Sequence, residues 1–191
     1  MRKTCPKSEF LEISSEMLSF ANKLLSSTEI EEAEKISEDL SKKSTRLNAQ
    51  RILKEIVGVR PKRPIYYAHN EINHLPRYTR FAVEYLGHFI DVLVKCVAAE
   101  KLSNPKCYES SFGVNLSKLK RIIPDTLYTE LDTFNKLIYR RAKHDFNVID
   151  RSHLFTSKEV VFTIFITMNL KAKLIGISEE AKDYCEDKTP F

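Results

Sequence analysis

Residues that interrupt helices are scarce in this chain of 191 residues, which has only four glycines and seven prolines. Charged residues make up 30% of the chain and hydrophobic residues 42%. Together these values favour a helical globular protein over a sandwich, a barrel or a disordered chain. The composition therefore predicts an all-α protein, and the length suits one compact domain or one domain with a helical appendage.

Several signatures of enzyme chemistry are absent from the sequence. The cysteines at positions 5, 96, 107 and 185 form no C-x-x-C pair and match no zinc-ligand spacing, so we expect reduced, mostly packed thiols. The scattered glycines form no phosphate-cradling loop, and no G-x-S-x-G motif is present. His69, Glu71 and His74 lie close together but not in the H-E-x-x-H order. We therefore expect no metal and no cofactor.

Long apolar runs are absent too. The first residues, MRKTCPKSEF, lack the apolar segment of a signal peptide, and no uncharged run approaches the roughly 20 residues that span a bilayer. We therefore expect a cytoplasmic protein that does not insert into membranes. The net charge is +5, and residues 1–59 carry ten basic and ten acidic residues. The whole basic excess thus lies in residues 60–191, which is the better candidate for contact with a polyanion.

The segment GVRPKRP at residues 58–64 marks the clearest boundary, because its glycine and prolines cannot continue a helix. It predicts four parts. Residues 1–59 are expected to form an N-terminal helical hairpin, and residues 60–75 a basic linker and loop. Residues 76–177 are expected to form a helical bundle, and residues 178–191 a C-terminal tail that can include a short helix.

Two helices are predicted in the hairpin. Ser8 can cap the first, and Thr28 with Glu31 matches the capping box of a long second helix. In the bundle, the region from Arg77 to Glu100 is apolar over much of its circumference and is expected to be the central helix. His88 lies within it, and we expect it to be a packed histidine rather than a catalytic one.

A loop is predicted at residues 103–113, followed by a short helix at residues 114–123. The late segment opens with a second capping-box match, Thr156 with Glu159. Its β-branched residues favour a strand, whereas its length, its cap and the glycine that follows favour a helix. We predict a helix there.

The most informative stretch is LDTFNKLIYRRAKHDFNV, at residues 131–148. Its helical face of apolar residues, continued by steps of three and four, reaches Arg141 and His144. An unpaired buried charge is strongly unfavourable, so these side chains must line a cleft or an interface, or find buried partners. Asp145, four residues after Arg141, is one candidate for such a partner. The pattern alone is compatible with both arrangements.

The order of these parts resembles that of a HEPN domain, the all-α bundle of the higher eukaryotes and prokaryotes nucleotide-binding class. The resemblance covers about residues 76–175: a long first helix RFAVEYLGHFIDVLVK, a short helix NLSKLKRIIP, a helix that ends in arginine and histidine, and a late helix opened by FTSKEV. It implies an all-α, HEPN-like helical bundle, here preceded by the N-terminal α-hairpin.

The resemblance also implies a function. HEPN ribonucleases carry an arginine and, after four to six intervening residues, a histidine, and they cleave RNA without metal in a cleft between two protomers. Here three residues separate Arg140 from His144 and two separate Arg141 from it, so the spacing departs from the family's. By resemblance His144 acts as general acid or base, Arg140 or Arg141 holds the scissile phosphate, and Asp145 orients the imidazole or pairs with Arg141.

Further RNA contacts are expected from four residues. These are Asn135 and Lys143 in the same helix, and Lys120 and Arg121 in an earlier basic cluster. The resemblance thus predicts an RNA-binding protein that forms a homodimer. It suggests an endoribonuclease that acts on single-stranded RNA in host defence or in a toxin–antitoxin system.

A different class of function fits the same residues. Arg141, His144 and Asp145 can form a buried polar cluster that fixes the packing of a non-catalytic, HEPN-like dimerisation and protein-interaction module. In that case residues 1–59 are a surface for an antitoxin or another protein partner.

Overall fold

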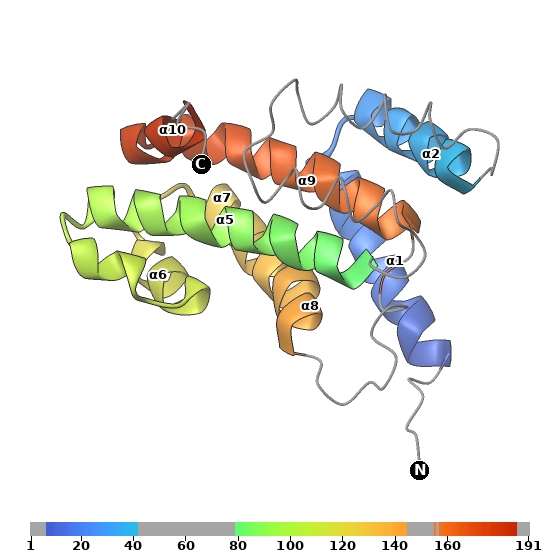
Figure 1. Cartoon of the computed structure of the whole chain (residues 1–191), viewed down its shortest axis with the longest axis horizontal. Coiled ribbons are helices and arrows are strands. Elements are labelled where there is room, and N and C mark those ends of the chain that lie inside the picture. Colours follow the sequence, from blue (N-terminus) through green and yellow to red (C-terminus); the bar gives the residue numbers. More distant parts are fainter. Residues whose placement is uncertain (1–6, 42–78, 145–154, 156, 187–191) are drawn as a thin grey trace, which may run out of the picture.

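The computed structural model describes residues 7–41, 79–144, 155 and 157–186 (Figure 1). Over these residues the chain is helical and contains no strand, which confirms the predicted all-α class. In this described part, no helix is both long enough and apolar enough to cross a membrane. The elements are α1 (Lys7–Leu24), α2 (Ser27–Ser41), α5 (Thr79–Lys101), the 3₁₀ helix η2 (Pro105–Tyr108), α6 (Phe112–Leu119), α7 (Asp125–Phe134), the π-helix η3 (Asn135–Tyr139), α8 (Arg140–His144), α9 (Ser157–Ile175) and α10 (Glu179–Glu186).

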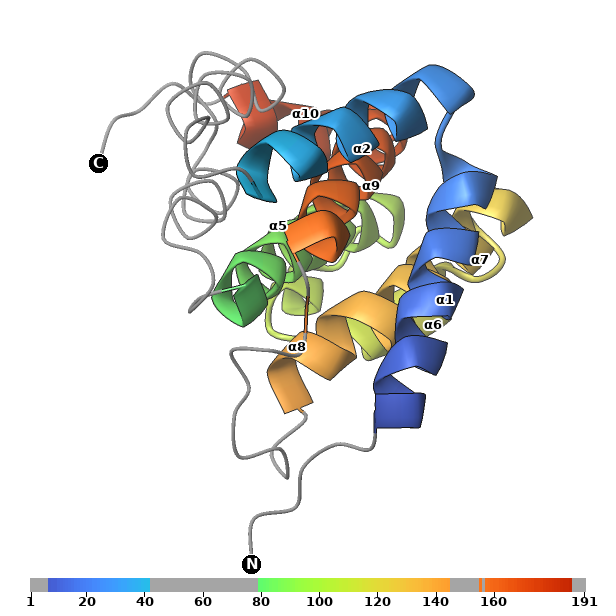
Figure 2. The same ribbon diagram turned by 90° about the vertical axis from the view of Figure 1, so that its right-hand side faces the viewer.

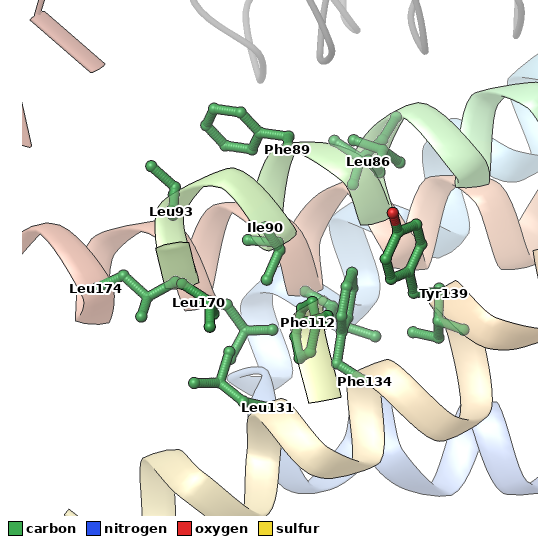
Figure 3. Close-up of a cluster of buried hydrophobic side chains, with 14 of the residues drawn as sticks. Leu86, Phe89, Ile90, Leu93, Phe112, Leu131, Phe134, Tyr139, Leu170 and Leu174 are labelled. Carbon is green, nitrogen blue, oxygen red and sulfur yellow. The ribbon is translucent and has the colours of Figure 1, made fainter. Parts of the chain in front are cut away.

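Helices α5 and α9 form the centre of the bundle and lie along one another (Figure 1). Ile90 and Leu93 of α5 meet Leu170 of α9 in a fully buried cluster, which Phe134 of α7 joins (Figure 3). Burial of aliphatic and aromatic side chains is the main force that holds such helices together. The prediction that the Arg77–Glu100 region forms the central core helix is therefore confirmed.

The β-branched segment that opens near residue 157 is the helix α9, as predicted. The backbone N–H of Gly176 donates to the carbonyl of Ala172 at 3.1 Å where this helix ends. Val160, Val161 and Ile166 of α9 are fully buried. Side-chain packing in the core thus outweighs the modest helix propensity of its β-branched residues.

Helices α1 and α2 pack on α9 within the same chain (Figure 2). Their buried side chains belong to the same core cluster as those of α5 and α9. Lys158 of α9 pairs with Glu34 of α2 at 2.9 Å, and Asn169 donates to the carbonyl of Leu24 at 3.4 Å. The two N-terminal helices therefore pack on the same central helix of the bundle.

The capping box of α2 differs from the predicted one. Its residues are Ser26 and Glu29: the Glu29 N–H donates to Ser26 Oγ at 3.3 Å, and the Ser26 N–H donates to Glu29 Oε2 at 2.7 Å. Thr28, the predicted cap, lies inside the helix. Helix α2 begins at Ser27, so Ser26 occupies the N-cap position and Thr28 already has a helical backbone conformation.

Two other predictions need correction. The segment 103–113 is not a continuous loop, because it contains η2 and the first turn of α6, so that Gly113 lies inside a helix. His88 is exposed on α5 and is not the packed histidine expected. Other predictions lie outside the described residues: the second helix beyond residue 41, the linker and loop at 60–75, and the end of the tail at 187–191.

Candidate functional site

The predicted site lies where α7 continues through η3 into α8. Helix α7 begins at Asp125, whose carboxylate is favourable in a first turn, and ends at Phe134. The wider turn of η3 follows, in which the Arg140 N–H donates to the carbonyl of Asn135, five residues back. Such π-turns are rare and recur at functional sites. Helix α8 then carries both arginines and ends at His144.

The adjacent arginines face different environments. Arg140 is exposed, whereas Arg141 is buried. Successive residues of a helix point about 100° apart, so one can face solvent while the next faces the core. The apolar stripe of Leu131, Phe134 and Ile138 is buried as predicted, and Arg141 continues it.

Arg141 contacts two side chains from beyond α8. Its Nη1 lies 3.6 Å from Glu159 Oε1, and its guanidinium carbon lies 4.3 Å from the ring centroid of Phe155. The ion pair compensates the charge of both buried groups, and the ring face adds a favourable cation–π contact. Arg141 therefore ties α8 to the first turn of α9. The predicted partner Asp145 lies outside the described residues, as does the side chain of His144.

A second polar network lies on the other side of this helix, against α5. The Tyr139 hydroxyl donates to Asp91 Oδ2 at 3.4 Å, and Lys95 Nζ lies 3.4 Å from the same oxygen. Lys143 Nζ lies 3.4 Å from the Tyr139 hydroxyl and 5.2 Å from its ring centroid. Lys143 is exposed, so this network connects a surface ammonium group to the buried carboxylate of Asp91.

The Tyr139 ring fits against the backbone of α5 at Gly87. A Cβ atom at Gly87 would overlap this ring, and would lie 2.8 Å from its Cγ. Burial raises the pKa of the Tyr139 phenol well above its usual range, and the nearby Asp91 carboxylate raises it further. The phenol therefore stays protonated and acts as a hydrogen-bond donor.

The remaining predicted RNA contacts are dispersed. Asn135 is buried in η3. Lys120 and Arg121 are exposed, and Lys120 Nζ lies 5.8 Å from the Tyr128 ring centroid. They precede α7, whereas Arg140 and Lys143 follow it, so roughly 20 Å of helix separates the two basic groups at 1.5 Å per residue. The structure brings Arg140 and Lys143 together on α8 and leaves Lys120 and Arg121 at the opposite end of α7.

Sequence reasoning missed five participants in these contacts: Asp91, Lys95, Tyr139, Phe155 and Glu159. One signal was available, because Asp91 interrupts the apolar run of α5. An acid in such a run implies a buried partner. Glu159 was assigned to a capping box, and its pairing with Arg141 joins positions 18 residues apart, which no local pattern specifies.

Comparison with known proteins adds no relative: no family model, no curated protein and no solved structure matches this chain. Among the described residues, no group of three or more histidines, cysteines and acids is placed to hold a metal ion.

Proposed function

We propose that this protein is a HEPN-like, RNA-binding protein that acts as a metal-independent endoribonuclease. The proposal rests on the resemblance in sequence and on one structural observation: Arg140 is exposed one helical turn before His144, while the neighbouring Arg141 is engaged in the core. Residues four apart on a helix are neighbours on its surface. Arg140 and His144 are therefore the pair that we assign to chemistry.

In this proposal the His144 imidazole removes the proton from the 2′-hydroxyl of the RNA or delivers one to the leaving oxygen. Imidazole suits both tasks because its ordinary pKa lies near neutral pH. Arg140 holds the scissile phosphate by a two-pronged contact and stabilises the charge that develops on it. One chain offers one His144, so two chains of a homodimer together supply one acid and one base.

Lys143 is the proposed contact to a neighbouring phosphate. It is exposed, it lies three residues after Arg140, and its contact with the Tyr139 ring restrains its position. A restrained ammonium group loses less conformational entropy when it binds a phosphate. The resemblance makes host defence or a toxin–antitoxin system the natural setting for such an activity, by analogy of family.

The experiment is cleavage of end-labelled single-stranded RNA in EDTA by wild type and by His144→Ala. The proposal predicts that wild type cuts and that the variant is slower by about 10²- to 10⁴-fold, the usual contribution of a general acid or base. The unfolding midpoint of the variant should match that of wild type. The enzyme assignment would be refuted if wild type left the RNA intact, or if His144→Ala cleaved it at the same rate as wild type.

A second candidate function is a non-catalytic dimerisation and protein-interaction module. The Arg141–Glu159 pair is compatible with it, because it gives one of the two arginines a role in packing α8 on α9. A wild-type protein that forms a stable dimer but leaves RNA intact in the cleavage assay would support this function. A partner such as an antitoxin would then be sought by its binding to the dimer.

A further inference from the structure

A groove of about 760 Å³ is lined by residues of α1, α7 and η3. Sites for small molecules in proteins usually measure about 300–1,000 Å³, so this volume suits a ligand of modest size. Helix α1 contacts η3. Asn169 of α9 donates to the carbonyl of Leu24 on α1, and Lys173 of α9 donates to Glu130 on α7. The two helices that line most of the groove, α1 and α7, thus both pack on α9.

Two pairs of hydroxyl side chains line the opposite walls. Ser15 and Ser19 lie four residues apart on α1, and Thr129 and Thr133 lie four residues apart on α7. Each pair therefore occupies one helical face. A hydroxyl carries one donor and two acceptor sites, so the groove presents several hydrogen-bonding positions in two facing rows.

The two threonines present acceptors to the groove. Thr129 Oγ1 donates to the carbonyl of Asp125 at 2.8 Å, and Thr133 Oγ1 donates to the carbonyl of Thr129 at 2.9 Å. Their protons are committed to the backbone, whereas their lone pairs remain available. A ligand that donates hydrogen bonds, such as one with several hydroxyl groups, satisfies them.

The groove also has an apolar part. Phe20 is almost completely buried, and Leu24 and Leu137 are partly buried beside it. Hydroxyl groups around an apolar patch suit a ligand with polar edges and an apolar ring face.

The charges around the groove cancel. Asp132 pairs with Lys136 at 2.6 Å, and Glu130 pairs with Lys173 at 2.7 Å. Glu16 and Lys23 on α1 add one charge of each sign. A phosphate site needs convergent cations that are not already neutralised, so the groove fits an uncharged ligand better than a nucleotide.

From these observations we infer that the α1–α7 groove binds a small, uncharged, polyhydroxylated ring compound of the size of a nucleoside or a disaccharide. The ring packs on the apolar patch, and its hydroxyl groups pair with the serines and threonines. This inference has its own readout, the binding of a small uncharged compound, so its failure is distinguishable from a failure of the proposed RNA cleavage.

The test is ligand-observed NMR with the full chain, using adenosine and maltose as probes and AMP as the charged counterpart of adenosine. We expect saturable binding of adenosine or maltose, and the probe that binds identifies the source of the ring. AMP should bind no more tightly than adenosine. No saturable binding of either uncharged probe, or tighter binding of AMP, would overturn the inference.

Variants locate the binding. The double change Ser19→Ala with Thr133→Val removes one hydroxyl from each wall and should weaken binding at least tenfold. Thr126→Val on α7 lies outside the groove and should leave binding unchanged. Ser15→Leu, at an exposed position, adds volume to the groove and should block binding even if the double variant folds poorly. Binding that survives Ser15→Leu would contradict the assignment.

Discussion

Arg141 and Glu159 form a buried ion pair that joins α8 to the start of α9. The distance from Nη1 to Oε1 is 3.6 Å, and the two side chains are 6% and 1% exposed. Removing one member of such a pair leaves an uncompensated charge in the core, whereas removing both does not. Arg141 therefore has a structural role in the core, whereas its neighbour Arg140 lies on the surface.

Arg141→Ala should destabilise the protein by about 3–5 kcal/mol, the usual result of breaking a buried pair. Urea denaturation measures this change, and Arg140→Ala, at an exposed position, should stay within about 0.5 kcal/mol of wild type. The double variant Arg141→Met with Glu159→Leu should recover much of the loss. Equal losses of unfolding free energy in Arg141→Ala and Arg140→Ala would contradict a core role for Arg141 and a surface role for Arg140.

Gly87→Ala should destabilise the protein by about 1–3 kcal/mol, because its methyl group would overlap the Tyr139 ring. Gly113→Ala is the matched control. There the nearest side-chain atom, Asn135 Nδ2, would lie at 3.9 Å, an ordinary contact. Alanine is the better helix former by about 1 kcal/mol, so Gly113→Ala should be neutral or stabilising. Thermal unfolding of both variants tests the fit of Tyr139 against α5.

Ser26→Ala should cost about 1 kcal/mol, because it removes the side chain that caps α2. Thr28→Ala should have a smaller effect, because Thr28 lies within the first turn and is not the capping residue. Denaturant unfolding of the two variants distinguishes them. A larger loss of stability in Thr28→Ala than in Ser26→Ala would instead support the predicted capping box of Thr28 and Glu31.

Glu100 predicts a dependence of stability on acid pH. Hydrogen bonds from Lys101, from the Ser178 hydroxyl and from the Glu180 N–H lower the pKa of its carboxyl from 4.5 to about 2. A carboxyl whose pKa is lower in the folded state contributes stability above its unfolded pKa, and this contribution is lost as the pH falls. Wild type should therefore lose stability relative to Glu100→Gln between about pH 4.5 and 2. If the free energies of unfolding of the two proteins change in parallel over this range, the bonds from Glu100 to Ser178 and Glu180 at the start of α10 do not contribute to stability.

Much of the fold followed from the sequence because helical periodicity is local. The apolar patterns of α5 and α7, the length and cap of α9 and the scarcity of glycine were enough to predict an all-α protein. The stripe of α7 also put Arg141 in line with its apolar residues, without deciding between a cleft and a buried position. Boundaries were less certain. Ser26 and Thr28 are both capping residues by type, and each precedes a glutamate by three residues, so the choice between them depends on where the chain leaves α1.

The partners across the bundle did not follow from the sequence. Glu159 and Asp91 reach Arg141 and Tyr139 from other helices, and local spacing cannot reveal such pairs. From the sequence, Asp145 was one candidate partner for Arg141, and it lies outside the described residues. The π-turn at residues 135–139 also lacks a sequence signature, because its residues fit an ordinary helix equally well.

The most direct test of the account is the rate of RNA cleavage by Arg140→Ala, measured in EDTA on end-labelled single-stranded RNA beside wild type. We predict that wild type cuts the RNA and that Arg140→Ala is slower by about 10²- to 10³-fold with an unchanged unfolding midpoint, because Arg140 stabilises charge on the phosphate and carries no part of the core. Cleavage by Arg140→Ala at the wild-type rate would contradict the assignment of the exposed face of α8 to catalysis.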